Sequence, residues 1–139
     1  LYRHVLEVRD KSAVPLSEEL DFMLHYVSIL SIRYNNALNV DFQGREHVGG
    51  HRILPLVLQM LIENIAKHNE ISLRKPMTVS VRVEAERIVV SNPIHPRSNV
   101  ASSSFGLGYI RECYRLQGGT MTYGGDRACF RVELSYLDR

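Results

Sequence analysis

Residues 54–69, with the sequence LPLVLQMLIENIAKHN, constrain the fold of this chain more than any other segment. Their apolar side chains recur three and four residues apart, which is typical of a helix with one buried face. The residues in this stripe are Leu58, Leu61, Ile62 and Ile65. The segment therefore predicts a helix that packs on a core.

Four polar side chains fall in one arc beside this stripe, since successive helical residues are turned by about 100°. They are Glu63, Asn64, Lys67 and His68. A carboxylate can orient or deprotonate a nucleophile, an amide oxygen can bind Mg²⁺, and lysine and histidine can contact phosphate oxygens. The arc is thus a candidate polar site at the edge of a core. A solvated helix face without chemistry is the alternative reading.

Composition limits the classes of function. The chain has 139 residues, of which 45% are hydrophobic, enough for one domain with a substantial core. The formal net charge is only +2, so neither a basic nucleic-acid groove nor attachment to an anionic membrane is expected. No apolar run approaches the roughly 20 residues of a membrane span. Because the chain begins with Leu1, we expect it to be a piece of a longer protein.

The cysteines and two loop histidines suggest no metal site. Cys113 and Cys129 stand apart, as expected of ordinary buried thiols in a reducing compartment. His47 and His51 flank a Gly-Gly pair without a nearby set of carboxylates or thiols, so a solvated loop is expected there.

The rest of the chain alternates between helical and strand-like patterns. Residues 1–10 resemble the end of a helix. A helix capped by Ser17 is expected from about residue 18 to about residue 32, and another over residues 106–116. Strands are expected over residues 38–42, 79–83, 87–90, 120–123 and 128–137. Residues 91–104 are expected to form a long mobile loop, and the last two strands a hairpin around Gly124–Gly125. This order predicts an α+β fold, a two-layer sandwich whose mixed, mostly antiparallel sheet is covered by helices on one face.

The order of these motifs also resembles a known family. LIENIAKHN is similar to the N box of the histidine-kinase branch of the Bergerat-fold ATPases, and FGLG at residues 105–108 is similar to the second glycine box. The strand ending at Val90 and the loop after it lie where the first glycine box and the ATP lid would be. Residues 2–42, and the proline in ILPLVLQMLIEN, resemble LytS/YehU-like sensor kinases.

The resemblance implies a role for each residue of the arc. Asn64 would be the amide that binds Mg²⁺, Glu63 a catalytic acid beside it, and Lys67 and His68 residues on the phosphate side of ATP.

Other implied ligands of ATP lie in the glycine boxes. Backbone N–H groups of Gly106 and Leu107 would face phosphate oxygens, and Arg111 matches the basic residue of the second box. The family's Asp-x-Gly pattern is replaced by Ser91–Asn92–Pro93, so Ser91 or Asn92 would accept a hydrogen bond from adenine. The second box also departs from the family at Ser104, Tyr109 and Cys113.

As a whole, the resemblance implies the catalytic ATP-binding domain of a two-component sensor histidine kinase. Residues 15–139 would form this domain, and residues 1–14 the end of an upstream dimerisation helix and its linker. The γ-phosphoryl group of ATP would pass to a histidine on upstream helices, because His4 lacks the surroundings of the family's acceptor, and then to a response regulator of the LytTR type. The parent would be an inner-membrane-anchored bacterial homodimer with this domain in the cytoplasm, in direct contact with neither membrane nor nucleic acid.

Two alternatives remain open at this point. The altered glycine boxes favour a degenerate Bergerat-fold module that acts in docking without ATP turnover, whereas the intact N box opposes it. An ATP-hydrolysing relative of the chaperone or mismatch-repair type fits the kinase-like linker less well.

Overall fold

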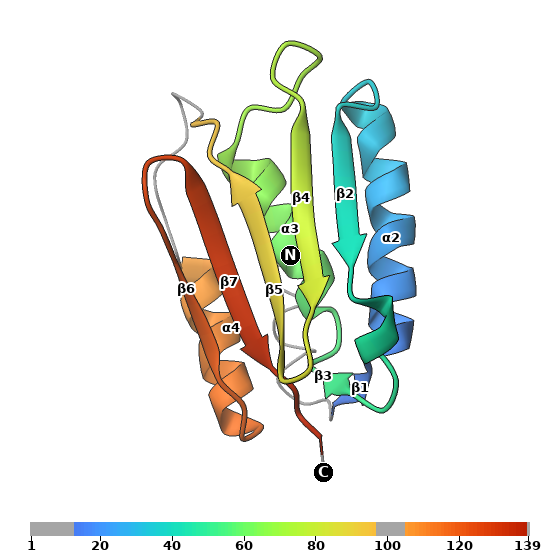
Figure 1. Ribbon diagram of the computed structural model, residues 1–139. Helices are drawn as coiled ribbons and strands as arrows, with labels where there is room; N and C mark the ends of the chain where they lie inside the picture. Colours follow the sequence, from blue (N-terminus) through green and yellow to red (C-terminus); the bar gives the residue numbers. More distant parts are fainter. Residues whose placement is uncertain (1–12, 97–104, 139) are drawn as a thin grey trace.

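The computed structural model describes residues 13–96 and 105–138, which form one helical layer and one main sheet (Figure 1). The helices are α2 (Leu16–Arg33), α3 (Val57–His68) and α4 (Phe105–Leu116), with a short 3₁₀ helix, η1 (Arg45–His47). The strands are β1 (Val14–Pro15), β2 (Leu38–Gln43), β3 (Arg52–Ile53), β4 (Met77–Val83), β5 (Arg87–Pro93), β6 (Met121–Gly125) and β7 (Cys129–Ser135).

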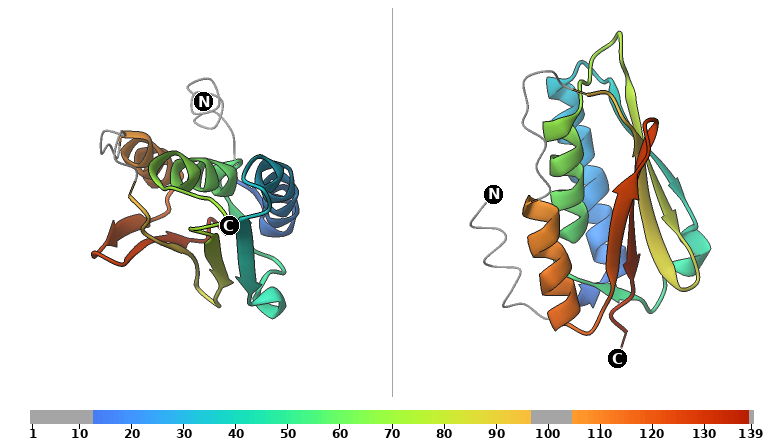
Figure 2. Two further views of the ribbon diagram at one scale, coloured as in Figure 1. Left: turned by 90° about the horizontal axis from the view of Figure 1, so that it is seen from above. Right: turned by 90° about the vertical axis from the view of Figure 1, so that its left-hand side faces the viewer.

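The main sheet has five strands in the order β2-β4-β5-β7-β6. β2 and β4 are parallel and the other neighbours are antiparallel, while β1 and β3 form a separate antiparallel pair. Seen from above, α4, α3 and α2 lie side by side over one face of the sheet (Figure 2). The expected two-layer sandwich with a mixed, mostly antiparallel sheet is confirmed.

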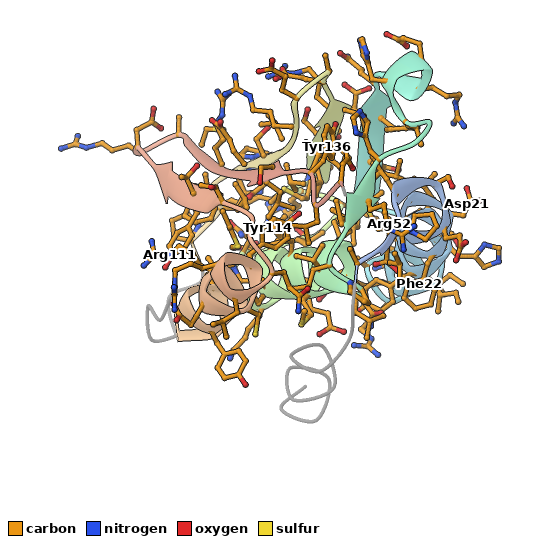
Figure 3. The ribbon with its side chains drawn as sticks, turned by 90° about the horizontal axis from the view of Figure 1, so that it is seen from below. Asp21, Phe22, Arg52, Arg111, Tyr114 and Tyr136 are labelled. Carbon is orange, nitrogen blue, oxygen red and sulfur yellow. The ribbon has the colours of Figure 1, made fainter. Side chains whose placement is uncertain are left out.

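The core lies between these two layers. In β4 every second residue from Met77 to Val83 is buried, as expected of a strand with one covered face. The predicted stripe of α3, from Leu58 to Ile65, joins the same cluster of buried side chains. Tyr114 of α4 also lies between helix and sheet (Figure 3), where its hydroxyl donates a hydrogen bond of 2.7 Å to the Ser135 carbonyl.

The start of α3 depends on a carboxylate from another helix. Leu56, just before the helix, has a left-handed backbone with φ of 64°, and no local side chain caps the helix. Its N–H instead donates a hydrogen bond of 2.6 Å to Oε1 of Glu19, a buried residue of α2. The first N–H groups of a helix have no partner within it, so this carboxylate supplies an acceptor where one is needed.

Two predicted turn positions are wrong. The loop expected from Ser91 begins later, because β5 continues through Pro93 while it remains paired with β7. Gly124 and Gly125 belong to β6, and the hairpin turns instead at Asp126, whose carboxylate accepts the N–H groups of Ala128 and Cys129.

Two predicted environments are also wrong. Cys113 is buried as expected, but Cys129 is exposed at the start of the edge-proximal strand β7. His51 is not a solvated loop residue: its ring stacks on Tyr136 with centroids 3.7 Å apart, and Nδ1 lies 2.7 Å from a carboxylate oxygen of Asp138.

Some expectations concern residues outside the described parts of the chain. These are the helix end at residues 1–10, His4, and residues 97–104 of the expected mobile loop. The domain boundary after residue 14 stays a prediction, although Val14 is already paired with Ile53 of β3. Within residues 13–96 and 105–138, no helix has the length and apolar character needed to cross a membrane.

Glu19 provides a test of how α2 supports α3. Burial raises the pKa of Glu19, although its hydrogen bond from Leu56 acts in the opposite direction. Because the pKa of Glu19 is higher in the folded state, the folded chain binds more protons than the unfolded chain at pH values just above about 4. The contribution of Glu19 to stability therefore falls as pH rises above about 4.3, the pKa of glutamate in an unfolded chain. Glu19→Gln keeps the acceptor and removes the charge. We therefore expect this variant to gain stability relative to wild type between about pH 4 and 7, as measured by urea unfolding.

The comparison variants separate the charge of Glu19 from its hydrogen bond. Glu19→Ala should be less stable than Glu19→Gln by about 1–3 kcal/mol, since it leaves the Leu56 N–H without an acceptor. Glu18→Gln, at an exposed neighbouring position, is the control for charge alone. Equal stability of the Ala and Gln variants would contradict the role given to this contact.

Candidate functional site

The predicted polar arc lies on a helix with a neighbour on each flank. α3 contacts α2 on one side and α4 on the other (Figure 2). The polar residues of α3 can therefore be assigned to one flank or the other from their contacts.

Glu63 lies on the α2 flank. Its Oε1 accepts hydrogen bonds from the Tyr26 hydroxyl of α2 at 3.2 Å and from Nε2 of Gln59 at 3.0 Å. Burial and the charge of Glu63 raise the pKa of Tyr26 to about 12, so Tyr26 remains the donor at neutral pH. These contacts direct Glu63 away from α4.

Asn64 lies on the opposite flank. It follows Glu63 by one residue and is thus turned by about 100°, toward the side of α3 that faces α4. The residue is half-buried, and among the described residues its side chain makes no hydrogen bond. Its amide oxygen is therefore available to a ligand.

His68 follows Asn64 by one helical turn and shares its flank, while the exposed Lys67 lies between the two flanks. Burial, and then the positive charge of Lys67, lower the pKa of His68. At neutral pH the imidazole is consequently neutral, so it offers a hydrogen bond rather than a full charge.

Strand alternation separates the two candidate adenine contacts. Ile88 and Val90 of β5 belong to the core beneath the helices, and Asn92 continues that alternation with 3% exposure. Ser91 faces the opposite, uncovered side of the sheet, as does Val89, which lies outside the core cluster. Only Asn92 therefore faces the helical layer.

The amide of Asn92 has a defined orientation. Nδ2 donates a hydrogen bond of 2.8 Å to the Pro93 carbonyl, so Oδ1 is the remaining polar atom of the side chain. Among the described residues no donor reaches this oxygen. It can accept a hydrogen bond from a ligand held under the helices.

α4 begins where the second glycine box was predicted. Gly106 and Leu107 lie in the first turn of this helix, whose N–H groups have no partner within the helix. Leu107 lies in the core, and among the described residues a Cβ on Gly106 would meet no atom within 4 Å. The N–H groups of such a helix start are suited to an anion.

Arg111 lies apart from this group. Its guanidinium carbon is 5.0 Å from the centroid of the Tyr123 ring in β6, a cation–π contact. Figure 3 shows Arg111 on the flank of α4 that points away from α3.

The fold thus gathers part of the predicted site. Asn64, His68, Asn92 and Gly106 come from three elements and lie on surfaces directed toward the region between α3 and α4. Glu63, Ser91 and Arg111 are directed elsewhere by their contacts or by strand alternation.

The sequence analysis missed Asn69, which ends α3. Its Nδ2 donates to the Ile65 carbonyl at 2.9 Å, and its Oδ1 accepts the His95 N–H at 2.8 Å. The Glu70 N–H also donates to the His95 carbonyl at 2.7 Å. Asn69 therefore fastens the segment after β5 to the end of α3. The only sequence signal for it was an asparagine at a helix end.

Known proteins resemble this chain in sequence or in fold. The chain is 30% identical over 86 residues to the sensor protein LytS of Enterococcus faecalis. This match covers 62% of this chain and 15% of LytS. The chain is 27% identical over 99 residues to the sensor protein kinase HptS of Staphylococcus aureus, covering 71% of this chain and 18% of HptS. The cytoplasmic segment of the histidine kinase QseC has the same fold, with a TM-score of 0.64 and 17% identity over 94% of this chain and 80% of that one. The chain is thus similar in sequence to LytS-like sensor kinases, and its fold is that of histidine kinase catalytic domains.

No protein-family model matches the chain, so the assignment depends on these relatives and on the fold. The matched residues span only 15–18% of the length of LytS and HptS. Histidine kinase catalytic domains in general bind ATP with Mg²⁺. In this chain, the residues between α3 and α4 are the candidate ligand site.

Asn69 provides a stability test of this region. We expect Asn69→Ala to lower the free energy of unfolding by about 1–3 kcal/mol, because the part-buried His95 N–H loses its acceptor. Asn64→Ala, which removes an amide that makes no hydrogen bond to the described residues, should change it by less than about 0.5 kcal/mol. Urea unfolding measures both, and an equal effect of the two substitutions would refute the assigned role of Asn69.

Proposed function

We propose that this domain binds ATP with Mg²⁺ and transfers the γ-phosphoryl group to a histidine supplied by another segment of its parent protein. The observation that carries the proposal is the Asn64 amide, which lies on the flank of α3 toward α4 and makes no hydrogen bond among the described residues. The relationship to LytS and HptS supports the same reading.

Asn64 would hold Mg²⁺ through its amide oxygen. Proteins commonly bind Mg²⁺ through one or two oxygen ligands, with substrate phosphates and water completing the shell, so a single amide fits this ion. Bound Mg²⁺ would neutralise charge on the phosphates. His68 and Lys67 would position phosphate oxygens from the same helix, His68 as a neutral hydrogen-bond donor and Lys67 as a cation.

Asn92 would contact the nucleobase. Its Oδ1 faces the helical layer and can accept a hydrogen bond from the exocyclic amine of adenine. Backbone N–H groups of Gly106 and Leu107 would meet phosphate oxygens at the start of α4. Catalysis would then consist of positioning and charge neutralisation, with no covalent intermediate on this domain.

Glu63, Ser91 and Arg111 would act outside direct contact with ATP. Glu63 is held at α2, Ser91 faces the uncovered side of the sheet, and Arg111 packs on Tyr123. For the parent protein we propose a homodimer joined by upstream helices, a response regulator of the LytTR type as phosphoryl acceptor, and an inner-membrane anchor that leaves this domain in the cytoplasm.

The first test is calorimetric titration of ATP with and without Mg²⁺. Wild type should bind ATP more tightly with Mg²⁺, and Asn64→Ala should reduce this Mg²⁺ effect by about tenfold or more, since even indirect partners of metal sites change affinity by about 10- to 100-fold. Asn39→Ala, an exposed amide on the edge strand β2, is the control. Absence of any ATP binding by wild type would refute the proposal and favour a docking module without turnover.

The second test compares the adjacent residues Ser91 and Asn92. Asn92→Ala should weaken ATP binding about threefold to tenfold, the effect of one hydrogen bond, whereas Ser91→Ala should change it less than about twofold. Because Nδ2 is engaged by the Pro93 carbonyl and Oδ1 can only accept, wild type should prefer ATP to GTP. Asn92→Asp should increase the preference for ATP about tenfold, because a carboxylate accepts from adenine and repels the guanine carbonyl.

Ser91→Asp is the matched control for this second test, because it adds the same charge one residue away on the opposite face. It should not alter the ATP preference. If Ser91→Asp improves ATP binding and Asn92→Asp does not, the assignment of the nucleobase contact to Asn92 is wrong.

A further inference from the structure

α2 and α3 are joined by two hydrogen bonds with the same spacing in the sequence. Glu19 of α2 accepts the Leu56 N–H at the start of α3, and Tyr26 of α2 donates to Glu63 at 3.2 Å. In each pair the partners are 37 residues apart, and the second pair lies seven residues after the first on both helices. We call these four residues the α2–α3 clamp.

This spacing fixes how the helices lie. Seven residues make nearly two helical turns, so both contacts fall on the same face of each helix. Equal steps along both sequences require that the two helices run in the same direction, as Figure 1 shows. The buried apolar face already holds α3 on the sheet. Two polar contacts about 10 Å apart along the axis then limit the remaining tilt and rotation of α3 relative to α2.

The second contact lies next to the proposed Mg²⁺ ligand. Glu63 and Asn64 are consecutive, so holding Glu63 at α2 directs Asn64 to the flank that faces α4. If Glu63 loses its partner on α2, a small turn of α3 within its packing would shift the Asn64 oxygen relative to a metal ion held under α4. Metal coordination is sensitive to such displacement because Mg²⁺ demands nearly ideal octahedral geometry.

The chemistry of the contact suits a fixed link. Glu63 receives two neutral donors on one oxygen, the Tyr26 hydroxyl and the Gln59 amide. Burial and the charge of Glu63 raise the pKa of Tyr26 to about 12, so the hydroxyl keeps its proton across the physiological range. A hydrogen bond from a neutral donor to a carboxylate is also stronger than one between neutral groups.

We propose that Tyr26 is a positioning residue for Mg²⁺ binding: through Glu63 it sets the rotation of α3 that presents Asn64 to the metal ion. This inference depends on the proposed function. It assigns Glu63 a positioning role in place of direct acid–base chemistry, and it extends the nucleotide site to a helix that does not border it.

The test separates Mg²⁺-dependent from Mg²⁺-independent binding. ATP is titrated calorimetrically into wild type and Tyr26→Phe, with Mg²⁺ and with a chelator in its place. Tyr26→Phe should reduce the gain in affinity caused by Mg²⁺ about threefold to tenfold, while affinity without Mg²⁺ should stay within about twofold. A residue that merely supports the fold would lower both affinities together.

Two further variants serve as comparisons. Glu63→Gln retains an oxygen acceptor for Tyr26 and should lose less of the Mg²⁺ effect than Tyr26→Phe. Tyr34→Phe, just after the end of the same helix, removes a hydroxyl that makes no hydrogen bond among the described residues, and it should have no effect.

The outcomes distinguish this inference from the proposed function. If wild type shows no Mg²⁺-dependent ATP binding, both are overturned. If wild type shows it and Tyr26→Phe leaves the Mg²⁺ effect unchanged, the positioning role is overturned and the proposed function stands. Selective loss of the Mg²⁺ effect in Tyr26→Phe, with Tyr34→Phe unchanged, supports the positioning role.

Discussion

The burial of one face of α3 against the sheet is the interaction on which the rest of the structure depends. Its apolar side chains enter the same core as alternate residues of β4 and β5. With that face committed, the remaining surface of the helix divides into two flanks and an exposed ridge that carries Lys67. Each polar residue of α3 acquires its surroundings from the helix packed on its flank.

The two flanks have different roles. On the α2 side, polar contacts are complete: Leu56 N–H meets Glu19, and Glu63 meets Tyr26 and Gln59. On the α4 side, Asn64 has no hydrogen bond among the described residues. The flank whose polar groups are hydrogen-bonded to α2 holds the helix, whereas a polar group without such a bond can bind a ligand. This division gives a physical basis for the proposed nucleotide site and for its dependence on α2.

In β5, too, pairing with a neighbouring element decides which side chain faces the candidate site. Pairing with β7 continues through Pro93, which carries the alternation of β5 as far as Asn92 and turns its amide toward the helices. Asn69 then fastens the following segment to the end of α3 through His95. The end of α3 and the segment after β5 are therefore held together.

The sequence by itself determined the elements that follow from local periodicity. The stripe of α3, the alternation of β4 and the order of helices and strands were enough for the two-layer fold, because periodic burial depends on neighbouring residues alone. The resemblance to the N box likewise named Asn64 and His68 as candidates from the sequence alone.

Only the tertiary structure decided which candidates share a surface. Glu63 and Asn64 fall in one arc of the helix, and the sequence does not say that α2 lies on one side and α4 on the other. Ser91 and Asn92 were equivalent until the β5–β7 ladder extended the strand and fixed which of them faces the helices. Arg111 matched the family motif, yet its guanidinium lies over the Tyr123 ring, because β6 is next to α4. These outcomes depend on contacts between residues far apart in the chain, and a local pattern carries no information about the neighbour that each side chain will meet.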